Sequence, residues 1–398
     1  MKSIKEVAII GGGASGLFCA ILLKEYIKNI NVTIYEAQNK VGKKILQTGN
    51  GKCNICNMNI STNNYNTNKL NNLIKSFKPN DLIDILNRWG LMTRVDEEGR
   101  VYPYSEKATT VLDIFLKKIN EYNIKIHTSC YIAKITVDKD NKYTIYSSDN
   151  NNKIMTSDYL VVCTGGYSSI NFNNNGYKLL ESLNHSSTKL YPSLCALKTI
   201  ENTKHLNGIR VKCKASIIVN GETKHQTKGE VLFKDDGLSG IAIFILSQFF
   251  EKNKKNIVSL DLYEEKTIDE LNKTLNKTFN NNIDLESNLM GYFPKMVNQD
   301  LINRTKINNN IGYNIKNYTF EIKDTYGFNN SQVTKGGIKL DEINLNTFES
   351  LKHNNLYISG EVLDVDGTCG GYNLYFAFAS ANSIVIDITN KLLKNGLC

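Results

Sequence analysis

Short apolar runs alternate with helical patterns near the start of the chain. Lys5–Ile10 is a β-branched run of strand length, and the apolar residues that follow Gly16 recur with a helical period. Residues 31–35 form a second apolar run. This order predicts a strand, a tight turn, a helix and a second strand that runs parallel to the first.

Further along, alternating apolar and polar residues between Asn-rich and Asp-rich turns predict a small antiparallel meander. Its expected strands are 124–137, 143–147 and 154–156. Two further apolar runs, at 158–163 and 355–358, each stop shortly before a glycine. We expect the first of these runs to return beside the opening strand. Helices are predicted at 109–119 and 375–393.

The middle of the chain shows another pattern, which predicts a small β-barrel with a helical cluster. The expected strands are 190–197, 210–219, 229–233 and 318–322, and the expected helices are 267–278 and 298–306. We therefore predict an α/β domain built from residues 1–189 and 333–398, interrupted by an inserted domain at 190–332. No glycine-rich fingerprint occurs in the insert.

Composition limits the classes of function. The chain has 398 residues, of which 41% are hydrophobic and 22% charged, so it can bury a sizeable core. Its net charge of +9 comes mostly from Lys, whereas Arg is scarce. Because Arg is the preferred residue for gripping phosphates and base edges, this composition argues against a dedicated nucleic-acid binder. Oligomeric state is not indicated by the sequence.

The cysteines and the apolar amino-terminal segment indicate a cytoplasmic protein. Nine Cys, an odd number, are scattered along the chain without a disulfide framework. Cys53 and Cys56 form a lone pair that supplies half of a zinc site, so no metal is expected. Residues 7–23 carry no charge, but glycines interrupt the run, which argues against a membrane span or a signal peptide.

The opening turn carries the strongest chemical signal. Gly11, Gly13 and Gly16 follow the first strand in the spacing of a dinucleotide-binding turn, where Gly13 lets the backbone approach a pyrophosphate and Gly16 allows close packing of helix and strand. Glu36 ends the second strand about 20 residues later, where a carboxylate accepts hydrogen bonds from ribose hydroxyls. The motif predicts an adenine dinucleotide site.

Three later segments favour FAD over NAD. Residues 41–54 form a polar, glycine-rich loop, which does not look like the next helix of a nicotinamide domain. This loop could present Lys44 or Lys52 to a pyrophosphate; the alternative is that its lysines are simply solvated. Glu361 follows the strand at 355–358 and could hold ribityl hydroxyls of a flavin. The glycine turn at 367–371 opens the final helix, whose N-terminus would stabilise negative charge on a reduced flavin ring.

Several motifs together resemble a bacterial family of NAD(P)/FAD-dependent oxidoreductases that includes aminoacetone-oxidase-like and dehydro-bile-acid-reductase-like flavoproteins. The motifs are VAIIGGGASGLFCA, KKILQTGNGKCN, VYPYSEKATTVLD, GLSG, VTKGGI and GEVLDVDGTCGGYNL. The resemblance covers nearly the whole chain and implies a glutathione-reductase-like FAD domain, of Rossmann type, with an insert.

By position, the resemblance assigns FAD contacts along the chain. They are Gly11, Gly13, Ala14, Ser15, Gly16, Glu36, Lys44, Gly49, Asn50, Gly51, Cys53, Asn54, Ile132, Thr164, Gly165, Gly360, Glu361, Gly371, Tyr372, Asn373 and Leu374. The chain departs from the family at Lys234, Asp235 and Asp236, where a threonine and a histidine are common, and at Ile241 and Tyr375. A different substrate specificity is expected if these positions face the substrate.

The reacting groups are less well marked. Arg100 and Tyr102, in a loop expected between two helices, and Lys335 are candidates for polarising a carbonyl or donating a proton, with structural turns as the alternative. A dithiol relay through Cys53 and Cys56 is a further alternative, disfavoured by their spacing. Since no separate nicotinamide domain is predicted, NADH or NADPH would bind transiently at the flavin.

We therefore expect an FAD-dependent oxidoreductase that exchanges a hydride between flavin N5 and a small organic substrate. NAD(P)H-linked reduction of an enone and oxidation of an amine both fit this expectation. A flavin-dependent tRNA-modifying enzyme is one alternative, suggested by the basic charge. A flavin redox sensor without turnover is another.

Overall fold

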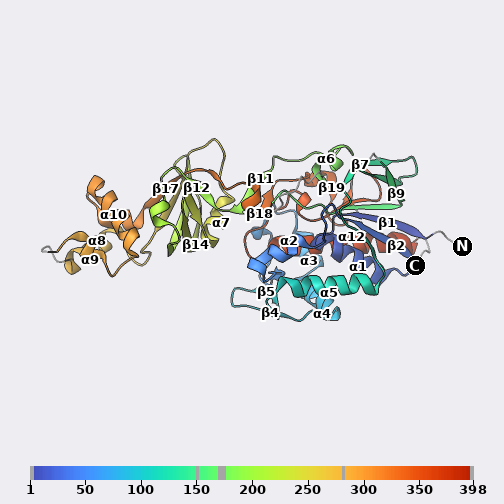
Figure 1. Ribbon diagram of the computed structural model, residues 1–398, viewed down its shortest axis with the longest axis horizontal. Coiled ribbons are helices and arrows are strands. Elements are labelled where there is room, and N and C mark those ends of the chain that lie inside the picture. The colour runs from blue at the N-terminus through green and yellow to red at the C-terminus, as the bar shows by residue number, and fades with distance from the viewer. Residues whose placement is uncertain (1–3, 149–151, 169–175, 280–282, 395–398) are drawn as a thin grey trace. The chain divides into compact units, whose positions relative to one another are not determined.

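The computed structural model of the chain describes residues 4–148, 152–168, 176–279 and 283–394. The described chain divides into two compact units, Met1–Tyr191 with Val333–Cys398, and Pro192–Gln332 (Figure 1). It passes from the first unit to the second within β11 (Tyr191–Cys195) and returns within β18 (Ser331–Lys335). Each unit has its own hydrophobic core.

A seven-stranded sheet forms the centre of the first unit, in the order β19-β20-β21-β10-β1-β2-β6. Five neighbouring strands run parallel: β21 (Leu356–Ile358), β10 (Tyr159–Val162), β1 (Lys5–Ile10), β2 (Ile30–Tyr35) and β6 (Lys125–His127). The edge strands β20 (Glu349–Ser350) and β19 (Ile343–Asn344) are antiparallel additions. β1 is buried over its last four residues, as its apolar sequence requires in a sheet covered on both faces.

Helices and a meander cover this sheet. Helices α1 (Ala14–Tyr26) and α12 (Tyr372–Lys394) lie side by side, while the meander β7 (Ile132–Val137), β8 (Tyr143–Ser147) and β9 (Lys153–Ser157) packs on the other side of the sheet (Figure 1). A small sheet contains β3 (Cys56–Asn57), β5 (Arg100–Pro103) and β4 (Thr93–Val95). The remaining helices are α2 (Lys43–Gln47), α3 (Asn71–Ser76), α4 (Pro79–Arg88), α5 (Ala108–Glu121) and α6 (Gly176–Glu181).

The second unit is a closed barrel with strand order β12-β15-β14-β13-β16-β17. The strands are β12 (Leu197–Thr199), β13 (Arg210–Val219), β14 (Glu222–Lys234), β15 (Gly237–Ser239), β16 (Asn256–Asp261) and β17 (Tyr318–Thr325). Its helices are α7 (Ile241–Ser247), α8 (Ile268–Thr278), α9 (Leu285–Leu289), α10 (Lys295–Asn308) and α11 (Ile311–Lys316). The predicted Rossmann-type α/β fold with an inserted barrel and helical region is confirmed.

Three local predictions are wrong. The expected strand 124–137 is split, because Ser129 has a positive φ of 51°, and its first part joins the parallel sheet as β6 while the second begins the meander. Arg100 and Tyr102 lie on strand β5, not in a loop between helices. The segment 41–54 contains the short helix α2, which begins after Gly42 in the left-handed conformation.

Candidate functional site

The carboxyl ends of four neighbouring strands bring the predicted contact residues to one edge of the parallel sheet. Glu36 follows β2, Gly11 follows β1, Thr164 lies two residues beyond β10, and Gly360 lies two residues beyond β21. These strands are adjacent in the order β2-β1-β10-β21 and all parallel. Ligands of open α/β sheets bind at such carboxyl ends, so this edge is the candidate site.

The glycine turn after β1 is shaped by close contacts. Gly11 has φ +108°, and its N–H donates to the carbonyl oxygen of Tyr35 at 2.8 Å. A Cβ at Gly16 would overlap the carbonyl oxygen of Gly11, so the helix approaches the turn too closely for a side chain. At Gly13, the residue before α1, no described atom lies within 4 Å of where a Cβ would be. The N-terminus of this 13-residue helix is therefore open to an anion.

Glu36 is held in place by backbone donors. Its Oε2 accepts the N–H of Gly12 at 2.7 Å, and its Oε1 accepts the N–H of Gln38 at 2.8 Å. The N–H of Cys130 donates to the Glu36 carbonyl oxygen at 2.9 Å, which brings the segment before Ile132 alongside. Since a carboxylate has about four acceptor positions, it keeps acceptors for ribose hydroxyls.

The loop before β3 has an unusual backbone. Asn50 and Cys53 have positive φ values of 53° and 57°, and the glycines on either side of Asn50 are also left-handed. Such non-glycine conformations cost roughly 1–3 kcal/mol each and persist where surrounding structure enforces them. The side-chain oxygen of Asn54 is buried, and among the described residues it has no hydrogen-bond partner.

Asn54 also connects this loop to the turn before α12. A Cβ at Gly371, which has φ +96°, would lie 2.6 Å from the Asn54 Oδ1 atom. In the same turn, Asn373 closes a ring of hydrogen bonds with Gly367, accepting its N–H at 2.7 Å and donating to its carbonyl at 2.8 Å. The Asn373 side chain thus shapes the turn itself, whereas the Asn54 oxygen remains available to a ligand donor.

Lys44 and Glu361, predicted separately, form an ion pair. The other Glu361 oxygen accepts the backbone N–H of Thr334 at 2.7 Å, and a Cβ at Gly166 would lie 2.8 Å from it. Thr334 Oγ1 in turn accepts the N–H of Tyr167 at 2.8 Å. Sequence reasoning did not single out Thr334, although it lies in the VTKGGI motif.

A chain of buried hydroxyl groups lies beneath the site. Ser15 Oγ is hydrogen-bonded to Ser359 Oγ, which is 2.8 Å from Ser380 Oγ. The N–H of Gly360 donates to Ser380 Oγ at 3.2 Å. These bonds fix the start of α1 relative to the end of β21 and to α12. Ser359 and Ser380 were not predicted, because a serine among the mostly apolar residues of a predicted helix does not by itself indicate a buried hydrogen bond.

The three reacting-group candidates differ in their surroundings. The Arg100 guanidinium is engaged by carboxylates of its own turn, with Nε 2.7 Å from Asp96 and Nη2 3.0 Å from Glu98. This pairing favours the structural alternative for Arg100. Tyr102 lies beside the glycine loop, since a Cβ at Gly49 would be 3.6 Å from its ring, and burial raises the pKa of its hydroxyl. Lys335 follows Thr334 at the end of β18.

Cys53 and Cys56 are buried thiols, and Cys369 is half-buried. Burial raises the pKa of Cys53 to about 11 and that of Cys56 to about 12, so both are protonated at neutral pH. Burial also raises the pKa of Cys369. A thiolate is the reactive form of cysteine, so these surroundings do not favour a dithiol relay. Cys398 lies outside the described residues.

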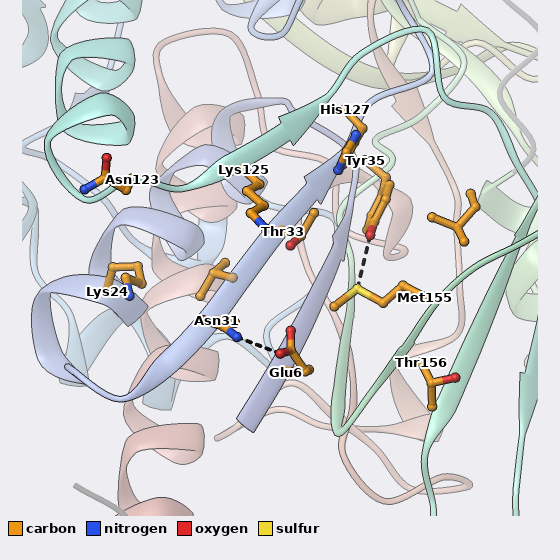
Figure 2. A pocket seen from close by; sticks show the side chains of 12 residues that line it. Glu6, Lys24, Asn31, Thr33, Tyr35, Asn123, Lys125, His127, Met155 and Thr156 are labelled. Carbon is orange, nitrogen blue, oxygen red and sulfur yellow. Dashed lines mark hydrogen bonds between the residues drawn. The ribbon is translucent and has the colours of Figure 1, made fainter. Parts of the chain in front are cut away.

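A separate cavity of about 490 Å³ opens on the sheet beside β2, β6 and β9. Figure 2 shows that its lining residues are tied to one another: Asn31 donates to Glu6 at 2.6 Å, and the Tyr35 hydroxyl contacts the Met155 sulfur at 3.1 Å. The Tyr35 ring stacks on His127 with centroids 5.3 Å apart. None of the predicted cofactor residues lines this cavity.

No group of three or more His, Cys, Asp or Glu side chains in the described residues could hold a metal ion. No described helix is long and apolar enough to cross a membrane.

Comparisons with known proteins give matches over nearly the whole chain. The family model described as HI0933-like protein Rossmann domain matches residues 5–385. A 3-dehydro-bile acid Δ(4,6)-reductase of Clostridium scindens is 29% identical over 406 residues, which cover 95% of this chain and 97% of the relative. A ribosomal RNA dihydrouridine synthase of Haemophilus influenzae is 25% identical, covering 98% and 100%. The predicted family resemblance is confirmed.

The solved structure of a 3-ketosteroid-Δ4-(5α)-dehydrogenase from Rhodococcus jostii covers 98% of both chains at 11% sequence identity, with a TM-score of 0.49.

Proposed function

Because this chain belongs to the HI0933-like family of Rossmann-domain proteins, we propose that it binds FAD at the strand-end site and reduces a carbon–carbon double bond conjugated to a carbonyl group. One observation carries the cofactor assignment. The glycine turn, Glu36, the 48–54 loop and Glu361 converge on one edge of the sheet, and the buried Asn54 oxygen there has no partner among the described residues.

The residues present fit the parts of FAD. The open N-terminus of α1 at Gly13 suits the pyrophosphate, and Glu36 suits the adenosine ribose. Glu361, fixed by Lys44 and Thr334, offers a carboxylate to ribityl hydroxyls. The Asn54 oxygen accepts a hydrogen bond, so it suits an N–H or hydroxyl of the cofactor.

When bound, FAD would supply or accept a hydride through its N5 atom. The chain's own groups then have two tasks. The N-terminus of the 23-residue helix α12 would stabilise the negative charge of a reduced flavin. Tyr102, whose hydroxyl stays protonated at neutral pH, donates a hydrogen bond or proton to the substrate carbonyl, with Lys335 as the second candidate donor.

The names of two relatives support the substrate class. A Δ(4,6)-reductase of a 3-dehydro-bile acid and a dihydrouridine synthase both saturate a carbon–carbon double bond in a compound that bears a carbonyl. When a hydride adds to the β-carbon of such a conjugated bond, negative charge develops on the carbonyl oxygen. A hydrogen-bond donor such as Tyr102 would stabilise that charge. NADH or NADPH would reduce the flavin by transient binding, since no second glycine fingerprint is present in the sequence.

RNA is the second candidate substrate. The ribosomal RNA dihydrouridine synthase matches at full length, and the chain carries a net charge of +9. A uracil ring contains the same conjugated bond, so the flavin chemistry would be shared while the substrate differs. Binding through phosphates would make this activity strongly dependent on salt.

The test is to purify the protein, record its visible spectrum and follow flavin bleaching under anaerobic NADH and NADPH in turn. The reduced enzyme is then mixed with a cyclic enone or with unmodified ribosomal RNA, and reoxidation is monitored. Reoxidation by the enone supports the main proposal, and reoxidation by RNA alone supports the second candidate. A protein that takes up no FAD overturns both. A flavoprotein that neither acceptor reoxidises overturns the reductase assignment but keeps the cofactor assignment.

A further inference from the structure

Asn57 links two parts of the strand-end site that are far apart in the sequence. It ends the short strand β3, and it is only 3% exposed. Its side-chain Nδ2 donates to the carbonyl oxygen of Gly370 at 3.2 Å and to that of Glu98 at 3.4 Å. Its Oδ1 accepts the backbone N–H of Asn59 at 2.9 Å. The amide is thereby used as donor and as acceptor, as the burial of a polar group requires.

The two carbonyl groups belong to the two elements that the proposed reaction needs. Gly370 lies in the glycine turn that opens α12, whose N-terminus would stabilise the charge of a reduced flavin. Glu98 lies in the turn before β5, the strand that carries the proposed donor Tyr102. Asn57 itself pairs with Arg100 in the register of β3 and β5. One buried side chain therefore connects the α12 turn to the strand of Tyr102.

The hydrogen bond to Gly370 also fixes the direction of the next N–H group. No described peptide bond is cis, and in a trans peptide the C=O and N–H groups point in opposite directions. Because the Gly370 carbonyl is directed at Asn57, the N–H of Gly371 points away from Asn57. Over the described part of the chain, this N–H has no recorded acceptor. It is an open donor with a fixed direction.

An open acceptor lies beside this donor. A Cβ at Gly371 would be 2.6 Å from Asn54 Oδ1, a buried atom that has no partner among the described residues. Gly371 has φ +96°, so glycine allows both the backbone conformation and the close approach of Asn54. A ring edge with a carbonyl oxygen next to an N–H, such as the pyrimidine edge of a flavin, is complementary to such a donor and acceptor.

Other contacts hold the rest of the turn but not the Gly370 peptide. The Tyr65 hydroxyl donates to the Tyr372 carbonyl at 2.9 Å, and the Asn373 side chain closes the beginning of the turn. Among the described residues, Asn57 is the one group that donates to the Gly370 carbonyl. Loss of the Asn57 amide should therefore leave the turn in place and free this one peptide to rotate.

We propose that Asn57 is a positioning residue for the flavin reaction: by holding the Gly370 carbonyl, it aims the Gly371 N–H at the negative charge that the flavin gains on reduction. This inference rests on the proposed function, because it requires FAD at the strand-end site. A donor that is aimed before the charge develops stabilises it without reorganisation. Asn57 thereby raises the midpoint potential of the bound flavin, because it favours the reduced, negatively charged form over the oxidised, neutral form.

The test compares the midpoint potential of bound FAD in wild type, N57A and N298A, measured by anaerobic redox titration with an indicator dye. Asn298 is a matched control, since it is 2% exposed and its amide also donates to two backbone carbonyls, those of Leu289 and Phe293, both at 2.9 Å. It lies on α10, in the unit that contains none of the predicted FAD contacts. Flavin absorbance and thermal unfolding report the occupancy and the stability of each variant.

We expect N57A to bind reduced flavin about tenfold more weakly relative to oxidised flavin, which lowers the two-electron midpoint potential by about 30 mV. N298A should lose stability and keep the wild-type potential. An unchanged potential in N57A overturns the proposal, and so does an equal shift in N298A, because the shift would then follow from weakened packing.

Two further measurements apply if N57A does not retain FAD. N57S is the second variant, since its side chain is neutral and polar but shorter than that of Asn, and it should lower the potential in the same direction. In the wild type, the amide hydrogen of Gly371 should exchange with solvent more slowly when the flavin is reduced than when it is oxidised. Equal exchange in the two states overturns the proposal.

Failure of the proposed function gives a different result. A wild type that takes up no FAD refutes the cofactor assignment and, with it, the role of Asn57. If reduced flavin is reoxidised by neither enone nor RNA, the reductase assignment fails, while a lowered potential in N57A still supports the role of Asn57. If FAD binds and N57A keeps the wild-type potential, only the role of Asn57 fails.

Discussion

The backbone N–H of Thr334 donates a 2.7 Å hydrogen bond to the carboxylate of Glu361, whose other oxygen is paired with Lys44. These two interactions join three elements at the sheet edge: Thr334 lies near the end of β18, Glu361 follows β21, and Lys44 belongs to α2. The carboxylate is fixed before any ligand arrives, which lowers the entropic cost of binding.

Substituting Glu361 by Gln should weaken FAD binding. The amide would lose the charge pairing with Lys44 and one acceptor position, so we expect the Kd of FAD for the apoprotein to rise about 10-fold or more. Quenching of flavin fluorescence during titration measures this Kd. The control K117M breaks an exposed pair with Glu121 on α5 and should leave the Kd unchanged; an equal loss in both variants would contradict the assigned role of Glu361.

Two glycines of the opening turn should respond differently to valine. At Gly13 no described atom lies within 4 Å of a Cβ, so G13V should fold with a nearly unchanged apoprotein melting temperature and fail to retain FAD. At Gly16 a Cβ overlaps the Gly11 carbonyl, so G16V should lose stability itself. Thermal unfolding of the apoproteins and the flavin absorbance of the purified variants separate these effects. G13V that retains FAD would refute the pyrophosphate placement.

Much of the parallel sheet was predictable because its strands are continuous apolar runs that end in glycine or acid. β1 matches the predicted 5–10, and α12 begins three residues before the predicted helix. The two-residue strands β3 and β20 leave no periodic signal, so they were missed. The left-handed Ser129 was not recognisable from sequence because serine rarely adopts that conformation.

In the candidate site, too, some features were predictable from the sequence and others were not. Its members were predicted one by one from motifs, whereas their pairings depend on strand order, which motifs do not encode. The ion pair of Lys44 with Glu361 spans 317 positions, and the bond between Ser15 and Ser359 spans 344. The carboxylates that pair with Arg100, those of Asp96 and Glu98, lie within four positions of it, so this pairing is local in sequence.

The buried hydroxyl chain should stabilise the fold. The variant S380A removes a hydroxyl group that is hydrogen-bonded to Ser359 Oγ and that accepts the N–H of Gly360. Both buried groups would lose this partner, so we expect the free energy of unfolding to fall by about 1–3 kcal/mol. Ser383 lies on the same helix and is also buried, so S383A is the matched control. Denaturant unfolding of both apoproteins measures the difference. A loss that is no larger in S380A than in S383A would show that the chain of hydroxyls adds nothing.

Acid should weaken the contact of Glu342, which precedes β19, with His185 and Ser186, which follow α6. Burial raises the pKa of Glu342, but the hydrogen bonds that its carboxylate accepts from Ser186, Lys352 and His185 outweigh this effect and lower the pKa from 4.5 to about 2. A carboxyl group whose pKa is lowered in the folded state stabilises that state fully above pH 4.5, and the stabilisation is lost as the pH falls toward 2.

The variant E342Q isolates this contribution. At pH 7 the apoprotein should unfold with about 1–3 kcal/mol less free energy than wild type, because the ionised hydrogen bonds to His185 and Ser186 are lost. Between pH 4.5 and about 2 this difference should shrink as the wild-type carboxyl group takes up its proton. Urea unfolding at pH 7, 4 and 3 tests the trend. A difference that stays constant with pH would mean that Glu342 acts through packing, since an uncharged contact does not change with protonation.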